Sequence, residues 1–256
     1  MTLPLSWTDR KVWIVGASSG IGMALARELA ARGARLALSA RSAEALKTLA
    51  VGLLGAGHRA LPLDVLDAEA VARASQTLNE EWGGIDAVVL AAAAYTPMRA
   101  FALDLDAART TVRVNIEGPL NCLAAVIPGM LSAGRGQIAI VASVAGYRGL
   151  PQALAYGASK AALINMAETL RLDLGERGIK VQVINPGFVR TPMTAQNEFK
   201  MPALMEPEQA ARCIADGLES DRFEIHFPAR FTLLLKLMRI LPYRLYFPLV
   251  RRITGL

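Results

Sequence analysis

The sequence predicts a single α/β domain built on a doubly wound parallel sheet of seven strands, followed by a short helical tail. Short apolar runs alternate with longer segments of helical periodicity, and neither a linker nor an internal repeat interrupts them. The runs are apolar on both faces, which is typical of parallel strands covered by helices on both sides. We therefore expect one domain over 1–228 and a tail over 229–256.

The expected elements follow in strict alternation. The strands are the apolar runs 12–15, 35–40, 60–63, 86–91, 137–142, 180–185 and 223–227. The helices lie between them, with glycines after several of their ends as C-terminal caps. They are 20–32, 42–54, 68–82, 104–132, 154–176 and 206–219. Pro119 lies inside the longest helix and cannot donate to the carbonyl of Asn115, so we expect a kink there.

Composition narrows the functional classes. Hydrophobic residues make up 53% of the chain and charged residues 20%, which favours a large packed core over disorder. The two cysteines and two histidines stand apart from one another, which disfavours metal catalysis and fits a reducing compartment. The start of the chain lacks the features of a signal peptide. We predict a cytoplasmic protein without a nucleic-acid partner.

A glycine-rich turn, "VWIVGASSGIG", follows the first expected strand and opens the first expected helix. Glycines let the chain turn tightly and approach a pyrophosphate, while the helix start supplies N–H donors and a positive dipole. The strand before it and the helix after it provide the context of a Rossmann-type dinucleotide site. The expected contacts with the dinucleotide are Gly16, Ser18, Ser19, Gly20, Ile21 and Gly22.

The residues after the second and third strands predict which dinucleotide binds. Ala40 stands where an acid commonly holds the ribose 2′-hydroxyl of NAD, and Arg41 and Ser42 follow it. An arginine and a hydroxyl would hold a 2′-phosphate, which predicts NADP(H). Alternatively, Arg41 is a solvated residue that caps a helix start. Asp64 and Val65 are expected at the adenine, where Asp64 either bonds the amino group or caps the next helix.

The segment "SVAGYRGLPQALAYGASK" holds the residues that indicate catalysis. Tyr156 and Lys160 lie four apart on an expected helix and share a face, and Ser143 closes the fifth strand at the carboxyl edge of the sheet. A tyrosine pKa of about 10 is too high for a base near neutral pH. A neighbouring ammonium and a positive nicotinamide ring favour the phenolate, so we expect a lowered pKa for Tyr156, with Ser143 holding the substrate oxygen beside it.

At these residues the sequence resembles the short-chain dehydrogenase/reductase family, over roughly residues 10–226. The resemblance rests on the glycine turn, on the Ser143, Tyr156 and Lys160 set, and on "NPGFVRT" after the sixth strand. It implies that Tyr156 is the acid or base, that Ser143 orients a carbonyl, and that Lys160 also binds the nicotinamide ribose. The residues bordering the nicotinamide would be Pro186, Val189 and Thr191.

The resemblance also implies a fourth catalytic residue, Asn115, which would join the cofactor contacts and whose freed carbonyl would hold a proton-relaying water. The alternative is an ordinary buried asparagine. Two positions depart from the family pattern: Val15 replaces a threonine, and "LAAA" (90–93) replaces "NNAG". We interpret both as an apolar repacking beneath the cofactor. Family members generally form dimers or tetramers, so we expect a homodimer or homotetramer.

Together these features predict an NADP(H)-dependent oxidoreductase that interconverts a carbonyl and an alcohol by hydride transfer. The alternative is a non-catalytic NADP(H)-binding sensor or scaffold of the same fold, although such proteins typically lose the tyrosine or the lysine. A soft apolar lid over 191–207 suggests a hydrophobic small-molecule substrate. The lid residues alternatively pack only against the body of the domain.

The tail over 229–256, which ends in "FTLLLKLMRILPYRLYFPLVRRITGL", carries the whole excess of positive charge. Six of the 28 basic residues follow Glu224, the last acid, and the remaining 22 equal the 22 acids. Pro242 divides the tail into expected helices over 231–241 and 243–253, each too short and too charged to span a membrane. Three roles stay open: a peripheral contact of 229–256 with an anionic membrane on its inner face, a cover for the pocket, or a subunit contact.

Overall fold

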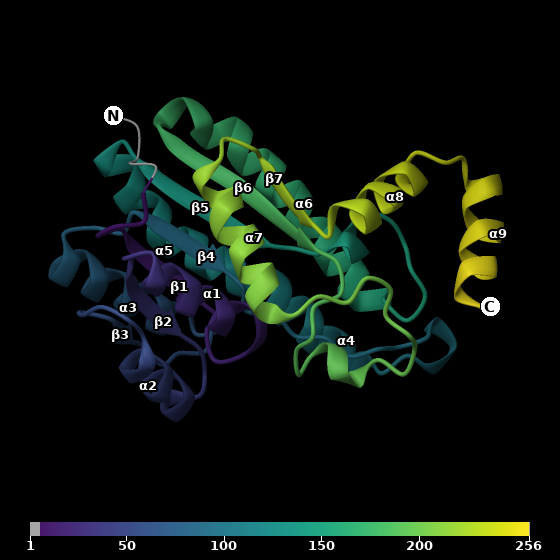
Figure 1. Ribbon diagram of the computed structural model, residues 1–256, viewed down its shortest axis with the longest axis horizontal. Helices are drawn as coiled ribbons and strands as arrows, with labels where there is room; N and C mark the ends of the chain where they lie inside the picture. Colours follow the sequence, from purple (N-terminus) through teal and green to yellow (C-terminus); the bar gives the residue numbers. More distant parts are fainter. Residues whose placement is uncertain (1–5, 256) are drawn as a thin grey trace.

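The structure is a computed structural model that describes residues 6–255. Residues 1–5 and 256, which the predicted domain and tail include, lie outside the described residues. The centre of the fold is a sheet of seven parallel strands in the order β3-β2-β1-β4-β5-β6-β7 (Figure 1). The strands are β1 (Lys11–Val15), β2 (Arg35–Ser39), β3 (Arg59–Ala60), β4 (Ala87–Leu90), β5 (Gly136–Val141), β6 (Ile179–Pro186) and β7 (Glu224–Phe227).

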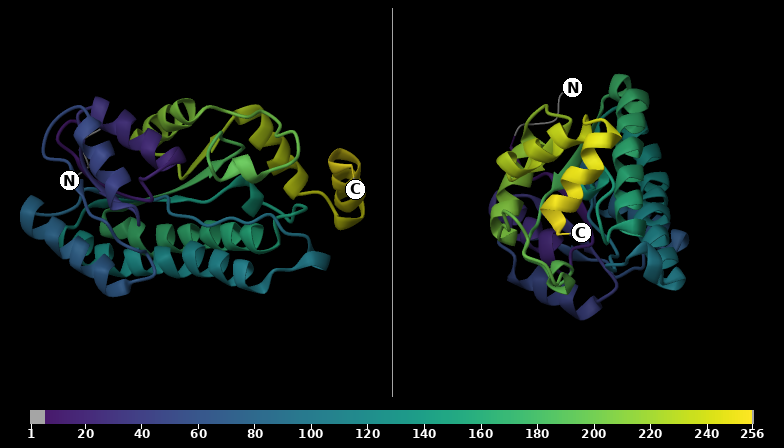
Figure 2. Two further views of the ribbon diagram at one scale, coloured as in Figure 1. Left: turned by 90° about the horizontal axis from the view of Figure 1, so that it is seen from below. Right: turned by 90° about the vertical axis from the view of Figure 1, so that its right-hand side faces the viewer.

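Helices cover both faces of this sheet, as Figure 2 shows. One core lies under α1, α2 and α7, and the other lies under α3, α5 and α6. The α-helices are α1 (Gly20–Ala31), α2 (Ala43–Gly52), α3 (Ala68–Trp82), α4 (Leu105–Val112), α5 (Gly118–Ala133), α6 (Leu154–Leu174), α7 (Pro207–Glu219), α8 (Ala229–Arg239) and α9 (Tyr243–Thr254). The predicted doubly wound α/β class is confirmed. The strand order reverses between β1 and β4, where sheets of this kind bind ligands.

The third strand is shorter than predicted. The sequence indicates a strand over 60–63, whereas β3 ends at Ala60. Two further backbone bonds nevertheless follow it, from the Leu61 N–H to the Leu38 carbonyl (2.8 Å) and from the Leu63 N–H to the Ala40 carbonyl (3.0 Å). The chain therefore stays paired with β2 as far as Leu63, and this pairing places Asp64 at the carboxyl edge of the sheet.

The long helix before β5 is interrupted, as Pro119 predicts. A π-helical turn, η2 (Arg113–Glu117), separates α4 from α5, and the Gly118 N–H donates to the carbonyl of Arg113, five residues back. A proline cannot donate to the carbonyl four residues before it, and a π-turn accommodates that missing bond. Asn115 lies in this turn. The interruption thus sets the position of a predicted site residue.

Within the described residues, Leu105–Ala133 has the length and mean hydropathy, 1.3, of a helix able to cross a membrane. In this structure the segment packs against α3 and α6, and its centre is fixed inside the domain by Asn115. Because 33% of its apolar window is buried in the domain, these contacts account for part of its apolar composition.

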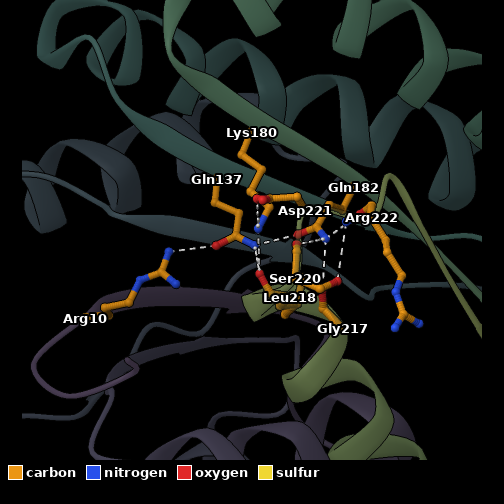
Figure 3. Close-up of polar contacts among 9 residues, drawn as sticks. All are labelled: Arg10, Gln137, Lys180, Gln182, Gly217, Leu218, Ser220, Asp221 and Arg222. Atoms are coloured by element: carbon orange, nitrogen blue, oxygen red, sulfur yellow. Dashed lines mark hydrogen bonds and ion pairs between the residues drawn. The ribbon is translucent and has the colours of Figure 1, made fainter. Parts of the chain in front are cut away.

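A buried polar network ties α7 to the sheet at the amino ends of β5 and β6 (Figure 3). Gln137 accepts from Arg10 (2.7 Å) and donates to the Gln182 side chain (2.7 Å) and to the Leu218 carbonyl (2.8 Å). The Gln182 amide also reaches the carbonyls of Gly217, Ser220 and Arg222, at 2.7–3.1 Å. The last carbonyls of a helix have no partner within it, and here strand side chains supply the donors.

Candidate active site

A cavity of about 430 Å³ lies at the carboxyl edge of the sheet, where the loops after β1, β2, β4, β5 and β6 meet. Every predicted site residue except Asn115 lines this cavity. These residues are Gly16, Ser18, Ser19, Gly20, Ile21, Gly22, Arg41, Ser42, Asp64, Val65, Ser143, Tyr156, Lys160, Pro186, Val189 and Thr191. Residues up to 175 positions apart in the sequence are therefore brought to one wall of the fold.

The glycine turn is shaped by close contacts that no side chain could share. Gly16 has φ +97°, and a Cβ there would lie 2.4 Å from the Ala92 nitrogen. A Cβ on Gly22 would lie 2.1 Å from the Gly16 carbonyl oxygen. The turn consequently packs directly on the segment after β4, and the N-terminus of α1 opens into the cavity beside it. A pyrophosphate fits such a cradle of backbone N–H groups.

The residues expected to select the cofactor lie at the same cavity. Ser42 is the N-cap of α2 and accepts from the Ala45 N–H at 3.3 Å, so Arg41 does not cap this helix. Arg41 is exposed and forms no ion pair with any residue of the described chain. Asp64 accepts from the Leu66 N–H at 2.9 Å and closes a turn, whereas Asp67 is the N-cap of α3.

The three predicted catalytic side chains converge from β5 and α6. Ser143 follows β5 and accepts from the Ala145 N–H at 3.1 Å. Tyr156 and Lys160 lie in the first two turns of α6, and the Tyr156 hydroxyl is a hydrogen-bonding neighbour of Ser143. The Lys160 Nζ lies 5.5 Å from the centre of the Tyr156 ring and donates to the Val141 carbonyl at 2.8 Å.

The electrostatics of the site differ from the predicted lowering of the tyrosine pKa. Burial raises the pKa of Tyr156 to about 12, although its hydrogen bond with Ser143 acts in the opposite direction. Lys160 is 2% exposed, and burial lowers its pKa to about 7. Desolvation disfavours the charged form of both groups, so the protein alone does not prepare a phenolate.

Asn115 lies behind the wall of the cavity instead of on it. Its side chain is fully buried and forms two hydrogen bonds with the backbone of Ala94. The side-chain oxygen accepts from the Ala94 N–H (2.8 Å), and the side-chain nitrogen donates to the Ala94 carbonyl (3.0 Å). It also donates to Ser159 (2.9 Å), whose hydroxyl donates to the carbonyl of Tyr156 (2.8 Å). The predicted contact with the cofactor is therefore not made by this side chain, because its hydrogen bonds join the loop after β4 to α6.

Several residues of the cavity were not predicted. The segment 91–94 and Thr194 are among them. Thr194 accepts from the Thr191 N–H (3.0 Å) and donates to the Val189 carbonyl (2.6 Å), which fixes the loop that holds both predicted neighbours. The three-residue spacing of the two threonines in "TPMT" is a recognisable signal for such a turn. For 91–94, the signal is their position directly after β4, at the carboxyl edge of the sheet.

The predicted lid closes over the side of the cavity that Tyr156 faces. The Tyr95 hydroxyl donates to Asn197 in the lid at 2.7 Å, and the Tyr95 ring lies edge-on to Tyr156 with ring centres 4.8 Å apart. Met193 lines the cavity, whereas Phe199 packs on Phe188, with ring centres 5.7 Å apart. Part of the lid therefore faces the cavity and part packs against the body, so both predicted roles occur.

Comparisons with known proteins agree with this arrangement. A model of the short chain dehydrogenase family matches residues 10–201. An uncharacterized oxidoreductase of Myxococcus xanthus (strain DK1622) is 37% identical over 246 residues, covering 95% of this chain and 97% of the relative. An uncharacterized oxidoreductase of Mycobacterium tuberculosis (strain H37Rv) is 32% identical, covering 93% and 96%. A short chain dehydrogenase from Burkholderia cenocepacia J2315, solved in complex with NADP, has a TM-score of 0.81 at 25% identity, covering 92% and 94%.

Proposed function

Because this chain belongs to the short-chain dehydrogenase family and is an oxidoreductase of that family, we propose that it interconverts a carbonyl and an alcohol. NADP(H), when bound, supplies or accepts the hydride. The observation that carries the proposal is the convergence of Ser143, Tyr156 and Lys160 on one cavity with the glycine turn. The N-terminus of α1, which follows this turn, opens into the same cavity and supports the binding of a pyrophosphate.

The roles of the three side chains follow from their positions. Ser143 holds the substrate oxygen, and Tyr156 passes a proton to or from that oxygen. Lys160 lies beside the Tyr156 ring, where an ammonium favours the phenolate. Asn115 positions this group through Ser159 and the backbone of Tyr156. A sensor or scaffold role, the second candidate, needs none of these side chains.

A screen of carbonyls and alcohols that follows NADPH absorbance tests the reaction. We expect Tyr156→Phe to lower turnover roughly 10²–10⁴-fold, the range for loss of a general acid or base. Tyr243→Phe is a matched control, since it removes the hydroxyl of an exposed tyrosine that does not line the cavity. Activity that survives Tyr156→Phe on every substrate would refute the proposal, and inactivity of the wild type on every compound would favour the sensor.

The preference for NADP(H) is proposed from Arg41 and Ser42, with Ala40 in place of an acid. The unpaired guanidinium of Arg41 is available for a 2′-phosphate. The double variant Ala40→Asp, Arg41→Ser should shift the ratio of kcat/KM toward NAD by roughly tenfold to a hundredfold, the value of one charge-assisted hydrogen bond. An unchanged ratio would contradict the assignment.

We also propose an apolar substrate and a homo-oligomer. Met193 in the cavity wall and the methionines of the lid support the first, and kcat/KM should rise with the length of the alkyl chain in a series of ketones. Exposed leucines on the outer faces of α5 and α6, including Leu120 and Leu172, support the second. A monomer by light scattering at micromolar concentration would refute the oligomer.

A further inference from the structure

The tail helices α8 and α9 form one end of the molecule, where α9 lies beyond α8 and at an angle to it (Figures 1 and 2). Within the described chain they share a small apolar cluster of Met238, Tyr246 and Val250. On its inner side α8 packs on the main domain through Phe231 and Leu235. The tail is therefore a built part of the fold, with a defined inner and outer side.

The loop after β5 fixes the orientation of both helices. Arg148 donates to the carbonyls of Met238 (2.9 Å) and Leu241 (2.6 Å), which closes the C-terminus of α8. The same guanidinium lies 3.9 Å from the centre of the Tyr246 ring, and the Tyr246 hydroxyl donates to the Gly149 carbonyl at 2.6 Å. These bonds determine which side chains of the tail point outward.

Large apolar residues are exposed on both tail helices. Leu233, Leu234 and Leu237 on α8, Ile240 directly after it, and Leu245, Phe247 and Ile253 on α9 are each 53–76% exposed. We call these seven residues and the bases beside them the tail surface. Scattered exposed leucines are ordinary, but seven large exposed apolar residues within 233–253 are a concentration of the kind that marks an interaction site.

The charge around this patch has one sign. Lys236 pairs with Glu224 at 2.6 Å. The other five bases of the tail, all exposed, form no ion pair with any residue from 6 to 255: they are Arg230, Arg239, Arg244, Arg251 and Arg252. No acid follows Glu224. The partner must therefore combine an apolar surface with negative charge.

Two of the three roles predicted for the tail fit the structure less well. Within 229–255, the part of the tail that the structure describes, no residue lines the cavity, which disfavours a cover. A symmetric contact between two tails would bring five unpaired cations against five more, because such a contact uses the same patch twice. An anionic bilayer interface offers acyl chains for the leucines and headgroups for the arginines.

We propose that the tail surface docks this protein on an anionic lipid bilayer. The leucines and Phe247 enter the acyl boundary, and the five free arginines meet the headgroups. This inference does not depend on the proposed reaction. It applies equally to an enzyme and to a sensor.

Co-flotation of the full chain with vesicles tests the proposal. We expect binding to phosphatidylcholine vesicles that contain phosphatidylglycerol at low salt, and at least tenfold weaker binding to phosphatidylcholine alone or at high salt. Deletion of the tail is a poor test, because it removes Phe231 and Leu235 from the core. Point variants on the outer side keep the fold and can be checked by thermal unfolding.

Two variants and two matched controls separate the contributions. Leu233→Gln with Leu237→Gln removes apolar contact, and Arg244→Gln with Arg251→Gln and Arg252→Gln removes charge; each should lower binding at least tenfold. Leu54→Gln is the apolar control, an exposed leucine after α2 that lies outside both the tail and the proposed oligomer contact. The charge control is a triple change to Gln at exposed, unpaired arginines of the body, namely Arg135, Arg171 and Arg177. Both controls should bind as the wild type does.

Three outcomes would overturn the proposal. Equal flotation with neutral and anionic vesicles, or none with either, removes the electrostatic recognition. Controls that lose binding as the tail variants do would show a general effect of net charge or hydrophobicity. A dimer that dissociates in Leu233→Gln, Leu237→Gln without vesicles would assign the surface to a second copy of the chain.

Discussion

The two edges of the sheet use buried polar groups in opposite ways. At the amino edge, the side-chain amides of Gln137 and Gln182 form hydrogen bonds with each other and with carbonyls at the end of α7. At the carboxyl edge, Lys160 is equally buried and borders a cavity. Its Nζ has three N–H donors, and among the described residues only the Val141 carbonyl accepts from it. A polar group whose bonds close within the chain stabilises the fold. One that is left partly open toward a cavity is available for a ligand.

The largest expected difference between the edges concerns Lys160. Lys160→Met should reduce NADPH-dependent turnover roughly 10²–10⁴-fold, because it removes the cation beside Tyr156. It should leave the free energy of unfolding unchanged or higher, since burying an amine is costly and a methionine of similar length is not. Turnover and urea unfolding of the same preparation measure both. A fully active Lys160→Met protein would place the chemistry elsewhere.

The amino edge should respond in the opposite sense. Gln182→Leu leaves the carbonyls of Gly217, Ser220 and Arg222 without this donor, which should cost about 2–4 kcal/mol in the free energy of unfolding. Turnover of the folded protein should not change. Gln76→Leu is the control, because Gln76 is exposed and bonds only Glu80 among the described residues, so its loss should cost less than about 0.5 kcal/mol. Equal costs would mean that the network carries no stability.

Asn115 combines both kinds of role. Its side-chain hydrogen bonds are all made to other residues of the protein, and they hold α6, the helix that carries Tyr156 and Lys160. Asn115→Leu should cost about 1–3 kcal/mol and lower kcat, while the affinity for NADP(H) changes little. Asn115→Asp should keep the bond from the Ala94 N–H and lose the two donated bonds. Dye-displacement or fluorescence titration gives the cofactor affinity. Unchanged turnover in Asn115→Leu would remove this residue from the positioning of Tyr156.

The smallest effect is a dependence of stability on pH. Burial lowers the pKa of Lys160 to about 7, below its value in the unfolded chain, so the unfolded state binds more protons between about pH 7 and pH 10. Stability should therefore rise with pH, by on the order of 1 kcal/mol from pH 6 to pH 8. Comparing urea midpoints of the wild type and Lys160→Met isolates this contribution. A parallel pH profile in the two proteins would show that Lys160 stays charged.

The sequence alone determined the features that depend on neighbours within a few residues. The glycine turn, the four-residue spacing of Tyr156 and Lys160, and the break at Pro119 each follow from local backbone geometry. Alternating apolar runs then determined the sheet, since parallel strands covered on both faces need little else to be recognised. For these reasons residue types and order were enough to name residues that line the cavity, and of the predicted site residues only Asn115 does not line it.

Only the tertiary structure decided which distant groups meet. Gln137 and Gln182 find partners on α7 that lie 35–81 residues away, and Asn115 finds Ala94 and Ser159 instead of the cavity. The pKa of Tyr156 was expected to be lowered by a neighbouring ammonium, but burial raises it. Burial also lowers the pKa of Lys160, which weakens that ammonium. Both effects depend on every element packed around the two side chains. The tail's composition is written in the sequence, but the side it turns outward is set by Arg148, a residue of another element.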